Sequence, residues 1–301
     1  MRRRFSKPRI WPLLAIVPDP LLVVRPDGRP ANLDGLWAPR PAFLVCGGPS
    51  LNDVPLERLR DRGIVSLGVN QAAAHAPVRA WCFSDTHWKF HHGLWLDPAI
   101  MTFAPWPKLG RKRRLIAKVP GEGFRQTNIR CRDCPNTYGY HRRGRFVPEE
   151  FLTTDYCHWG AGGDQPADRP FPGGCLCTML VGLRLLIYLG VRRIYLLGVD
   201  HRGRDGMCYG FADTKKERNR RYKWEAAQLA ALIPVFAAAG VSAYNCSPTS
   251  ALEVFPHVPW EAALADCRGG VPAEPFDTVG WYAKNEIQAE IADKPTWRPP
   301  S

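Results

Sequence analysis

The sequence predicts an α/β fold, a Rossmann-like and mostly parallel sheet with helices on both faces and a basic lid inserted into it. The main observation is alternation, since short apolar runs that end in glycine or a polar residue are separated by segments with helical periodicity. A chain of 301 residues, 45% of them hydrophobic, is also long enough to bury a sizeable core. Arginines interrupt the longest apolar stretch, Thr178 to Leu197, below the roughly 18 to 20 residues of a membrane span. We therefore expect no membrane span.

An N-terminal extension, residues 1–40, comes first and is rich in Pro and Arg. Its basic head is followed too soon by prolines for a signal peptide, and we expect a cytoplasmic protein. The first block of the core follows, over residues 41–96. It is predicted to contain three buried strands, at 42–46, 64–70 and 80–85, and a helix at 52–61.

Residues 97–174 lack clear periodicity and contain many Gly, Pro and aromatic residues. A compact domain seldom holds so long a loop unless it is functional, so we expect an insertion or lid over the site. Between Lys108 and Arg145 this segment carries twelve Lys or Arg against two acidic residues, most of the net charge of +13. A concentrated positive field attracts anions, which points to an anionic acceptor such as DNA or an acidic glycan. A solvated basic face is the alternative.

The second block of the core, residues 175–268, restores the alternation. Its predicted elements are a helix at 178–190, a strand at 193–200, a helix at 222–239 and a strand at 241–245. A C-terminal tail, 269–301, is expected to be a docked helix with a Pro-rich end.

Ligands of a parallel α/β sheet bind at the carboxyl ends of the strands, where four polar segments of this chain are expected. One is the loop of Gly47, Gly48, Pro49 and Ser50, in which glycines let the backbone approach a phosphate and free amides at the start of the next helix donate to it. Asn70 and Gln71 form the second segment and are placed to contact a base or ribose. These six residues are the predicted nucleotide site, and plain turns are the alternative.

Six short motifs occur in an order that is known from one group of enzymes. They are Phe43 to Leu51, Gly68 to Gln71, Tyr188 to Gly190, Arg193 to Asp200, Tyr209 to Asp213 and Tyr244 to Ser250. Their order resembles that of the bacterial lipooligosaccharide sialyltransferases and, more loosely, of hydroxymethylpterin diphosphokinases and flagellin-glycosylation accessory proteins. The resemblance covers residues 42–90 and 175–255. It implies a variant Rossmann-like transferase fold with Gly47, Gly48, Ser50 and Asn70 around the nucleotide, Thr178 near the donor group, and the basic insertion as the lid.

The general base of those sialyltransferases, a His on the helix before the last core strand, has no counterpart between Arg220 and Glu225. Polar residues that follow apolar strands are the remaining candidates for catalysis, namely Asp85, His87, Asp200 and His201. Imidazole deprotonates a hydroxyl near neutral pH, and a well-placed carboxylate can do the same; ordinary loop histidines are the alternative. Because Asp85 to His87 is not the Asp-x-Asp pair that holds a divalent ion, we expect a metal-independent reaction in which lid cations stabilise the leaving phosphate.

A structural zinc is one interpretation of the cysteines in the insertion. Cys131 and Cys134 have the x2 spacing of a chelating pair, and Cys157 with His158 supplies two further ligands. Adjacent ligands rarely chelate one ion comfortably, so reduced thiols are the other interpretation.

These observations predict a nucleotide-sugar-dependent glycosyltransferase-like enzyme whose nucleotide is left open. A nucleic-acid-binding module on a degenerate transferase fold is the first alternative, with Trp81, Trp88 and Trp95 as exposed stacking platforms. Diphosphate transfer to a pterin-like molecule is the second, because its nucleotide loop would look the same. The sequence does not indicate an oligomeric state.

Overall fold

The computed structural model describes residues 23–85, 87, 90–119, 123–144, 146–160, 176–202 and 215–269. One large sheet contains β1 (Val23–Val24), β2 (Ala42–Val45), β3 (Ser66–Val69), β4 (Ala80–Cys82), β5 (Met101–Pro105), β8 (Thr137–Tyr140), β11 (Arg193–Leu197) and β12 (Ser242–Asn245). The helices are α1 (His92–Leu96), α2 (Thr178–Tyr188), α3 (Lys215–Ala238) and α4 (Trp260–Arg268). Outside the sheet lie a hairpin of β6 (Arg114–Val119) with β7 (Gly123–Arg130) and a short pair of β9 (Arg142–Arg143) with β10 (Cys157–His158).

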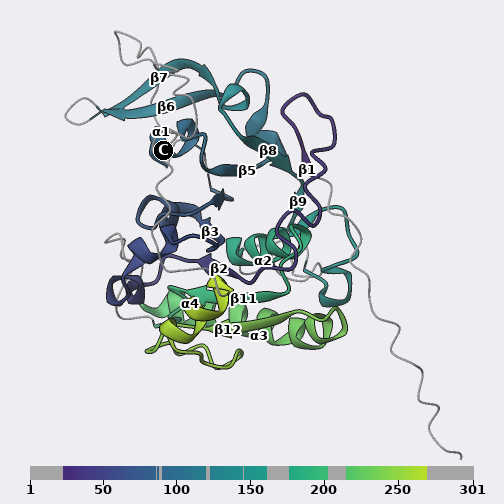
Figure 1. The fold of residues 1–301 in the computed structure, drawn as a ribbon. Coiled ribbons are helices and arrows are strands. Elements are labelled where there is room, and N and C mark those ends of the chain that lie inside the picture. Colours follow the sequence, from purple (N-terminus) through teal and green to yellow (C-terminus); the bar gives the residue numbers. More distant parts are fainter. Residues whose placement is uncertain are drawn as a thin grey trace, which may run out of the picture.

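The large sheet has the strand order β1-β8-β5-β4-β3-β2-β11-β12, and every pair is parallel except β1 with β8 (Figure 1). This confirms the α/β class and the mostly parallel sheet. Chain order runs outward from β2 in both directions, through β3 and β4 on one side and through β11 on the other. The reversal of strand order therefore lies between β2 and β11, and ligands of open α/β sheets bind at the carboxyl ends of such strands.

The two faces of the sheet are buried in separate core clusters, because successive side chains of a strand point to opposite faces. In β2, Leu44 packs with α2 and α3, whereas Phe43 and Val45 pack with α1, α4 and the hairpin. Figure 1 shows α2 and α3 next to the β2 and β11 half of the sheet and the hairpin at the opposite end. Helices thus cover both faces, as the apolar runs predict.

The segment 97–174 differs from the sequence expectation, because it does not stand apart from the core. It contributes β5 and β8, which extend the parallel sheet beyond β4. Only the β6 and β7 hairpin and the β9 and β10 pair lie outside the large sheet. The large sheet therefore continues past residue 97.

The segment 52–61 also differs from its predicted helix. Two short 3-10 turns, Pro49–Asp53 and Leu56–Arg60, take its place. Pro55 lies between them, and proline lacks an N–H and disfavours helical geometry in the residue before it. The Gly47 to Ser50 loop therefore leads into a single five-residue turn instead of a full α-helix.

Both ends of the described chain lie against the sheet. Residues 23–40 add β1 to the edge at β8, and the Trp37 amide donates to the Leu189 carbonyl after α2. At the other end α4, which the sequence pattern does not predict, packs on the face of Phe43. The predicted helix of the tail lies outside the described residues. Within the described ranges, no helix combines the length and apolar character that a membrane crossing requires.

Candidate functional site

The reversal of strand order brings the Gly47 to Ser50 loop against the end of β11. The Ser50 amide donates to Asp200 Oδ2 at 2.8 Å, and the Ser50 hydroxyl donates to Ser247 Oγ at 3.0 Å. The Gly48 amide donates to the Gly198 carbonyl at 2.7 Å. Two segments that lie 150 residues apart in the sequence therefore form one compact corner, with Asp200 at its centre.

This corner corrects the expected role of the glycine loop. A side chain at Gly48 would collide with Asp200 Oδ2 and would approach the Gly198 carbonyl oxygen to 2.5 Å, so glycine is required for the close approach of the carboxylate. The Ser50 amide is already bound to that carboxylate. The sequence predicts a free amide donor for a phosphate at this position, whereas in the structure this amide is engaged by Asp200.

Asn70 joins the ends of β3 and β4 to the start of α2. Its side-chain amide donates to Thr178 Oγ1 at 3.2 Å, and its Oδ1 accepts from the Ser84 amide at 3.1 Å. Its backbone has a φ of 50°, which asparagine tolerates better than most residues, and its carbonyl accepts from the Trp81 indole at 2.9 Å. The structure therefore brings Asn70 and Thr178 together at the carboxyl edge of the sheet. Gln71 follows in a 3-10 turn and is half-buried.

Arg142 lies at the carboxyl end of β4, because its guanidinium donates to the Ser84 carbonyl at 2.9 Å. The same guanidinium stacks over the ring of Trp159 at 3.4 Å from its centroid. Burial lowers the pKa of Arg142, and the charge of the exposed Asp85 acts against this shift. Asp85 thus lies near a cation of the predicted lid, and Arg142 is fixed in place by a hydrogen bond and an aromatic ring.

His87 is held in a different setting. Its ring is buried, and burial followed by the charges of Arg113 and Lys108 lowers its pKa from 6.5 to about 4. The ring therefore belongs with the base of the hairpin and is neutral at physiological pH. The structure shows no contact of His87 with Asp200 or with the glycine loop.

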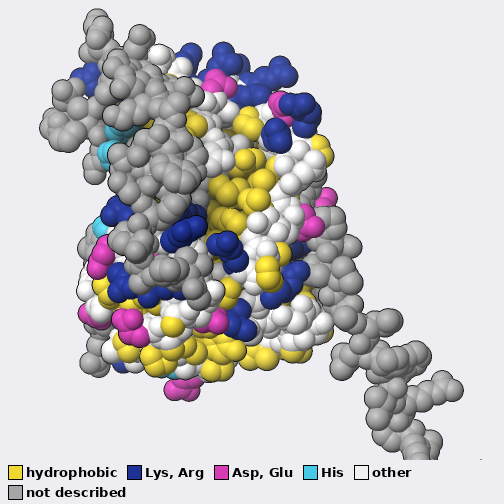
Figure 2. Space-filling model, viewed as in Figure 1, with side chains coloured by type: hydrophobic (Ala, Val, Ile, Leu, Met, Phe, Trp, Pro, Cys, Tyr) yellow, Lys and Arg dark blue, Asp and Glu magenta, His cyan; other side chains and the backbone are white. Residues whose placement is uncertain are grey.

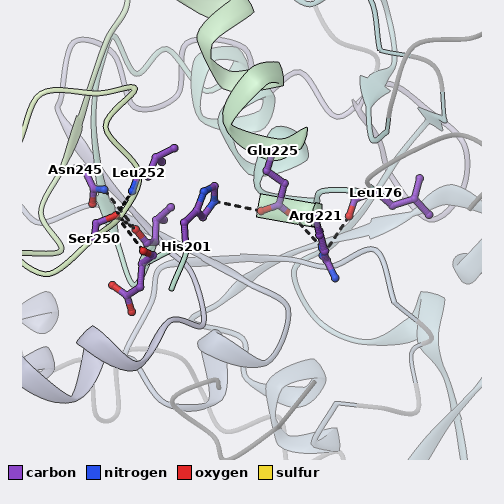
Figure 3. A network of polar contacts seen from close by, with 9 residues as sticks. Leu176, His201, Arg221, Glu225, Asn245, Ser250 and Leu252 are labelled. Atoms are coloured by element: carbon purple, nitrogen blue, oxygen red, sulfur yellow. Dashed lines mark hydrogen bonds and ion pairs between the residues drawn. The ribbon is translucent and has the colours of Figure 1, made fainter. Parts of the chain in front are cut away.

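His201 forms an ion pair with Glu225 of α3, the Nε2 and Oε2 atoms being 3.2 Å apart. Its ring stacks on Tyr222, with centroids 4.8 Å apart and an interplanar angle of 10°. Glu225 also accepts from Arg221 Nε at 3.0 Å, and Arg221 reaches on to the Leu176 carbonyl at 3.3 Å. Figure 3 shows His201 pointing toward Glu225, with Arg221 beyond that carboxylate.

The carboxylate of Glu225 is stabilised in its charged form. Burial alone would raise its pKa, but the hydrogen bond with His201 and the charge of Arg221 outweigh burial and lower the pKa below its ordinary value. Glu225 thus lies between the His201 imidazole and the Arg221 guanidinium, near the carboxyl edge of β11.

Sequence reasoning missed Glu225, Arg221 and Tyr222. A signal was present, because residues at spacings of three and four share one face of a helix. These residues lie on α3, the helix that precedes the last strand of the sheet, β12. The imidazole comes here from the end of β11, and the helix supplies the carboxylate that contacts it.

Comparison with models of known protein families, with curated proteins and with solved structures gives no match to this chain. The functional argument therefore depends on the geometry of the site.

The four predicted zinc ligands are not brought together. Cys131 and Cys134 are buried in the core cluster that holds the hairpin, whereas Cys157 is buried in the cluster on the other face of the sheet. His158 Nε2 lies 3.2 Å from the Glu150 carbonyl oxygen, and burial raises the pKa of Cys131 to about 12. Among the described residues, no group of three or more His, Cys, Asp or Glu is arranged to hold a metal ion. We do not carry the four-ligand zinc site further.

The predicted stacking platforms are also corrected. Trp81 and Trp95 are completely buried, and Trp88 lies outside the described residues. Buried rings cannot stack on bases, so these two tryptophans are not stacking platforms for a nucleic acid. Figure 2 shows Lys and Arg in several separate groups on one face, with apolar and uncharged surface between them.

Proposed function

We propose that this chain is a nucleotide-sugar-dependent glycosyltransferase-like enzyme that acts on a hydroxyl of an anionic acceptor, an acidic glycan or a modified nucleic acid, without a catalytic metal. The observation that carries the proposal is the pairing of His201 with Glu225 at the carboxyl end of β11, beside the reversal of strand order. A histidine oriented by a carboxylate is the arrangement that general-base catalysis uses to activate a hydroxyl.

The contact between Nε2 and Glu225 Oε2 assigns a role to each nitrogen of the neutral ring. Nε2–H donates to Glu225, which leaves Nδ1 as the basic nitrogen. Nδ1 takes the proton of the acceptor hydroxyl while that oxygen attacks the anomeric carbon of the donor sugar. The bond from the anomeric carbon to the phosphate oxygen breaks, and the nucleotide leaves with the electron pair. Glu225 is a positioning residue that stabilises the imidazolium which forms.

Arg142 is the cation that is best placed to meet the leaving phosphate. It is half-buried at the carboxyl edge and is held by the Ser84 carbonyl and Trp159, so little reorganisation is needed when charge develops. By contrast, the hairpin cations Arg111, Lys112, Arg113 and Arg114 are exposed, and they suit an anionic acceptor that arrives from solvent.

The motif order that resembles lipooligosaccharide sialyltransferases supports a transferase of this kind. Asn70 and Thr178, which that resemblance assigns to the nucleotide and donor group, are in contact with each other.

The test is a thermal-shift panel with CMP, UDP, GDP, ADP and their sugar conjugates, followed by a turnover assay with the best donor. We expect one nucleotide to raise the melting temperature by mass action, and its sugar conjugate to be consumed. Consumption of ATP with a pterin acceptor would identify a diphosphokinase instead. Polyanion binding without consumption of any donor would identify a nucleic-acid-binding module.

A further inference from the structure

Asp200 contains a buried carboxylate oxygen that the fold leaves unused. Only 4% of the residue is exposed, and Oδ2 is bound to the Ser50 amide. Oδ1 is buried as well and has no hydrogen-bond partner within the part of the chain that the structure describes. Leaving such an atom without a partner costs free energy, so it is expected to meet a donor that arrives with a ligand.

The position of this oxygen is independent evidence for a ligand. Asp200 lies three residues beyond β11, opposite the loop that follows β2, and these are the two strands between which the order reverses. This is the place where open α/β sheets bind nucleotides. Asp200 therefore combines a buried oxygen that lacks a donor among the described residues with a position at which this class of sheet binds ligands.

We propose that Asp200 Oδ1 accepts a hydrogen bond from the nucleoside part of the donor, a ribose hydroxyl or a base N–H, and that the phosphates lie away from it, at Arg142. This inference rests on the proposed function, because it assigns the orientation of the nucleotide in the same site. It inverts the orientation that the glycine loop suggests from sequence.

The chemistry of the corner favours a neutral donor group over a phosphate. A carboxylate accepts hydrogen bonds and repels a phosphate at short range. The nearest loop amide, that of Ser50, is already bound to Oδ2. Gly48 leaves room for the carboxylate itself, since a side chain there would collide with Oδ2.

The edge of the sheet leads from Asp200 to a site that suits the phosphates. Strands β2 and β3 separate β11 from β4, and three spacings of about 4.8 Å amount to about 14 Å. An extended nucleotide sugar can bridge that distance. At its far end the Arg142 guanidinium is bound to the carbonyl of Ser84, and the Asn70 side chain lies between the two ends of the span.

The experiment separates the two halves of the ligand. Calorimetry would measure the binding of adenosine, cytidine, guanosine and uridine, and of inorganic pyrophosphate, to the full chain and to three variants. Asp200→Asn keeps an oxygen for the Ser50 amide but replaces the free acceptor by a donor. Arg142→Gln removes the cation. Arg40→Gln is the matched control, because Arg40 also donates to a backbone carbonyl, that of Gly63, but lies before β2 at the opposite edge of the sheet.

We expect Asp200→Asn to weaken binding of the preferred nucleoside about 10-fold or more and to leave pyrophosphate within about 2-fold. Arg142→Gln should show the reverse pattern, and Arg40→Gln should change neither by more than about 2-fold. On the unaltered protein, one of the 2′-deoxy, 3′-deoxy or N-methylated-base analogues should bind about 10-fold more weakly, and Asp200→Asn should not discriminate against it. That measurement stands even if a variant does not fold.

Two results would overturn the inference while leaving the proposed function intact. One is pyrophosphate binding that Asp200→Asn strengthens about 10-fold, which would place the phosphates at the loop. The other is Mg²⁺ binding that Asp200→Asn abolishes while nucleoside binding is unchanged, which would make Asp200 a cation ligand. If no nucleotide or nucleotide sugar binds to the unaltered protein, the proposed function itself fails.

Discussion

The regions around His201 and His87 contain the same chemical group in opposite surroundings. Both histidines follow an apolar strand of the parallel sheet and come within a few residues of its carboxyl end. His201 contacts a carboxylate at 3.2 Å and stacks on a tyrosine, whereas His87 is buried next to Arg113 and Lys108. The difference teaches that position after a strand does not identify a catalytic base. The neighbouring side chains come from distant segments and differ in charge, with a carboxylate beside His201 and two cations beside His87.

Replacing the two histidines in parallel gives the largest expected effect. His201→Asn should reduce the turnover of the best donor by about 10² to 10⁴, because it removes the general base. His87→Asn should change turnover per folded molecule by less than about 2-fold, since its ring is buried beside Arg113 and Lys108, which hold it neutral. Steady-state kinetics on both variants measure this, and equal losses would refute the distinction between the two regions.

The second prediction concerns His87 and the stability of the fold at acid pH. Its pKa is about 4 in the folded chain against 6.5 in the unfolded chain, so between these values the unfolded chain binds more protons. Stability is therefore fully present above pH 6.5 and decreases as the pH falls toward 4, by up to about 3 kcal/mol from this residue.

Urea denaturation at pH 7 and at pH 4.5 measures this decrease, and His87→Gln is the variant that isolates it from the carboxylates. The variant should lose less stability between the two pH values than the unaltered protein. An identical decrease in both would mean that His87 is protonated in the folded chain.

The smallest expected effect is on stability, when one glycine in each region is replaced by alanine. Gly48→Ala should destabilise the chain by about 1 to 3 kcal/mol, because the new methyl group meets Asp200 and the backbone at Gly198. Gly110→Ala, before the hairpin, is the matched control, since its nearest neighbour would lie at an ordinary 3.5 Å. Denaturant midpoints of both variants provide the measurement. If Gly48→Ala were as stable as the control, the loop and Asp200 would be able to move apart at little cost in free energy.

Sequence reasoning anticipates that Ser50, Asn70 and Asp200 lie at one edge of the sheet, because the carboxyl ends of neighbouring parallel strands meet there. It does not anticipate the hydrogen bonds of Ser50 with Asp200 and of Asn70 with Ser84. The chain supplies these residues directly after apolar runs. No knowledge of helix packing is needed to place them together.

The contacts that sequence reasoning misses depend on tertiary packing, and several of them involve strands too short to show a hydrophobic periodicity. Strand β5 ends in a proline and β8 has only four residues between turns, so neither has a periodicity that separates it from the surrounding loop. Glu225 reaches His201 only because α3 packs in one rotation against the β11 half of the sheet. Arg142 meets Trp159 through the side-by-side pairing of β9 and β10, which are two residues long.

The short strand β1 covers one margin of the large sheet. It pairs antiparallel with β8, and Val24 folds back to form a bridge with Pro30, a residue that has no amide hydrogen to offer a neighbour. At the opposite edge, the Asn245 amide donates to the Pro256 carbonyl and the Val258 amide donates to the Asn245 carbonyl. Backbone groups at both margins are thus already engaged within the described chain. Sheet extension from one molecule into the next would first require one of these margins to peel away, which guards a concentrated solution against fibrous aggregation.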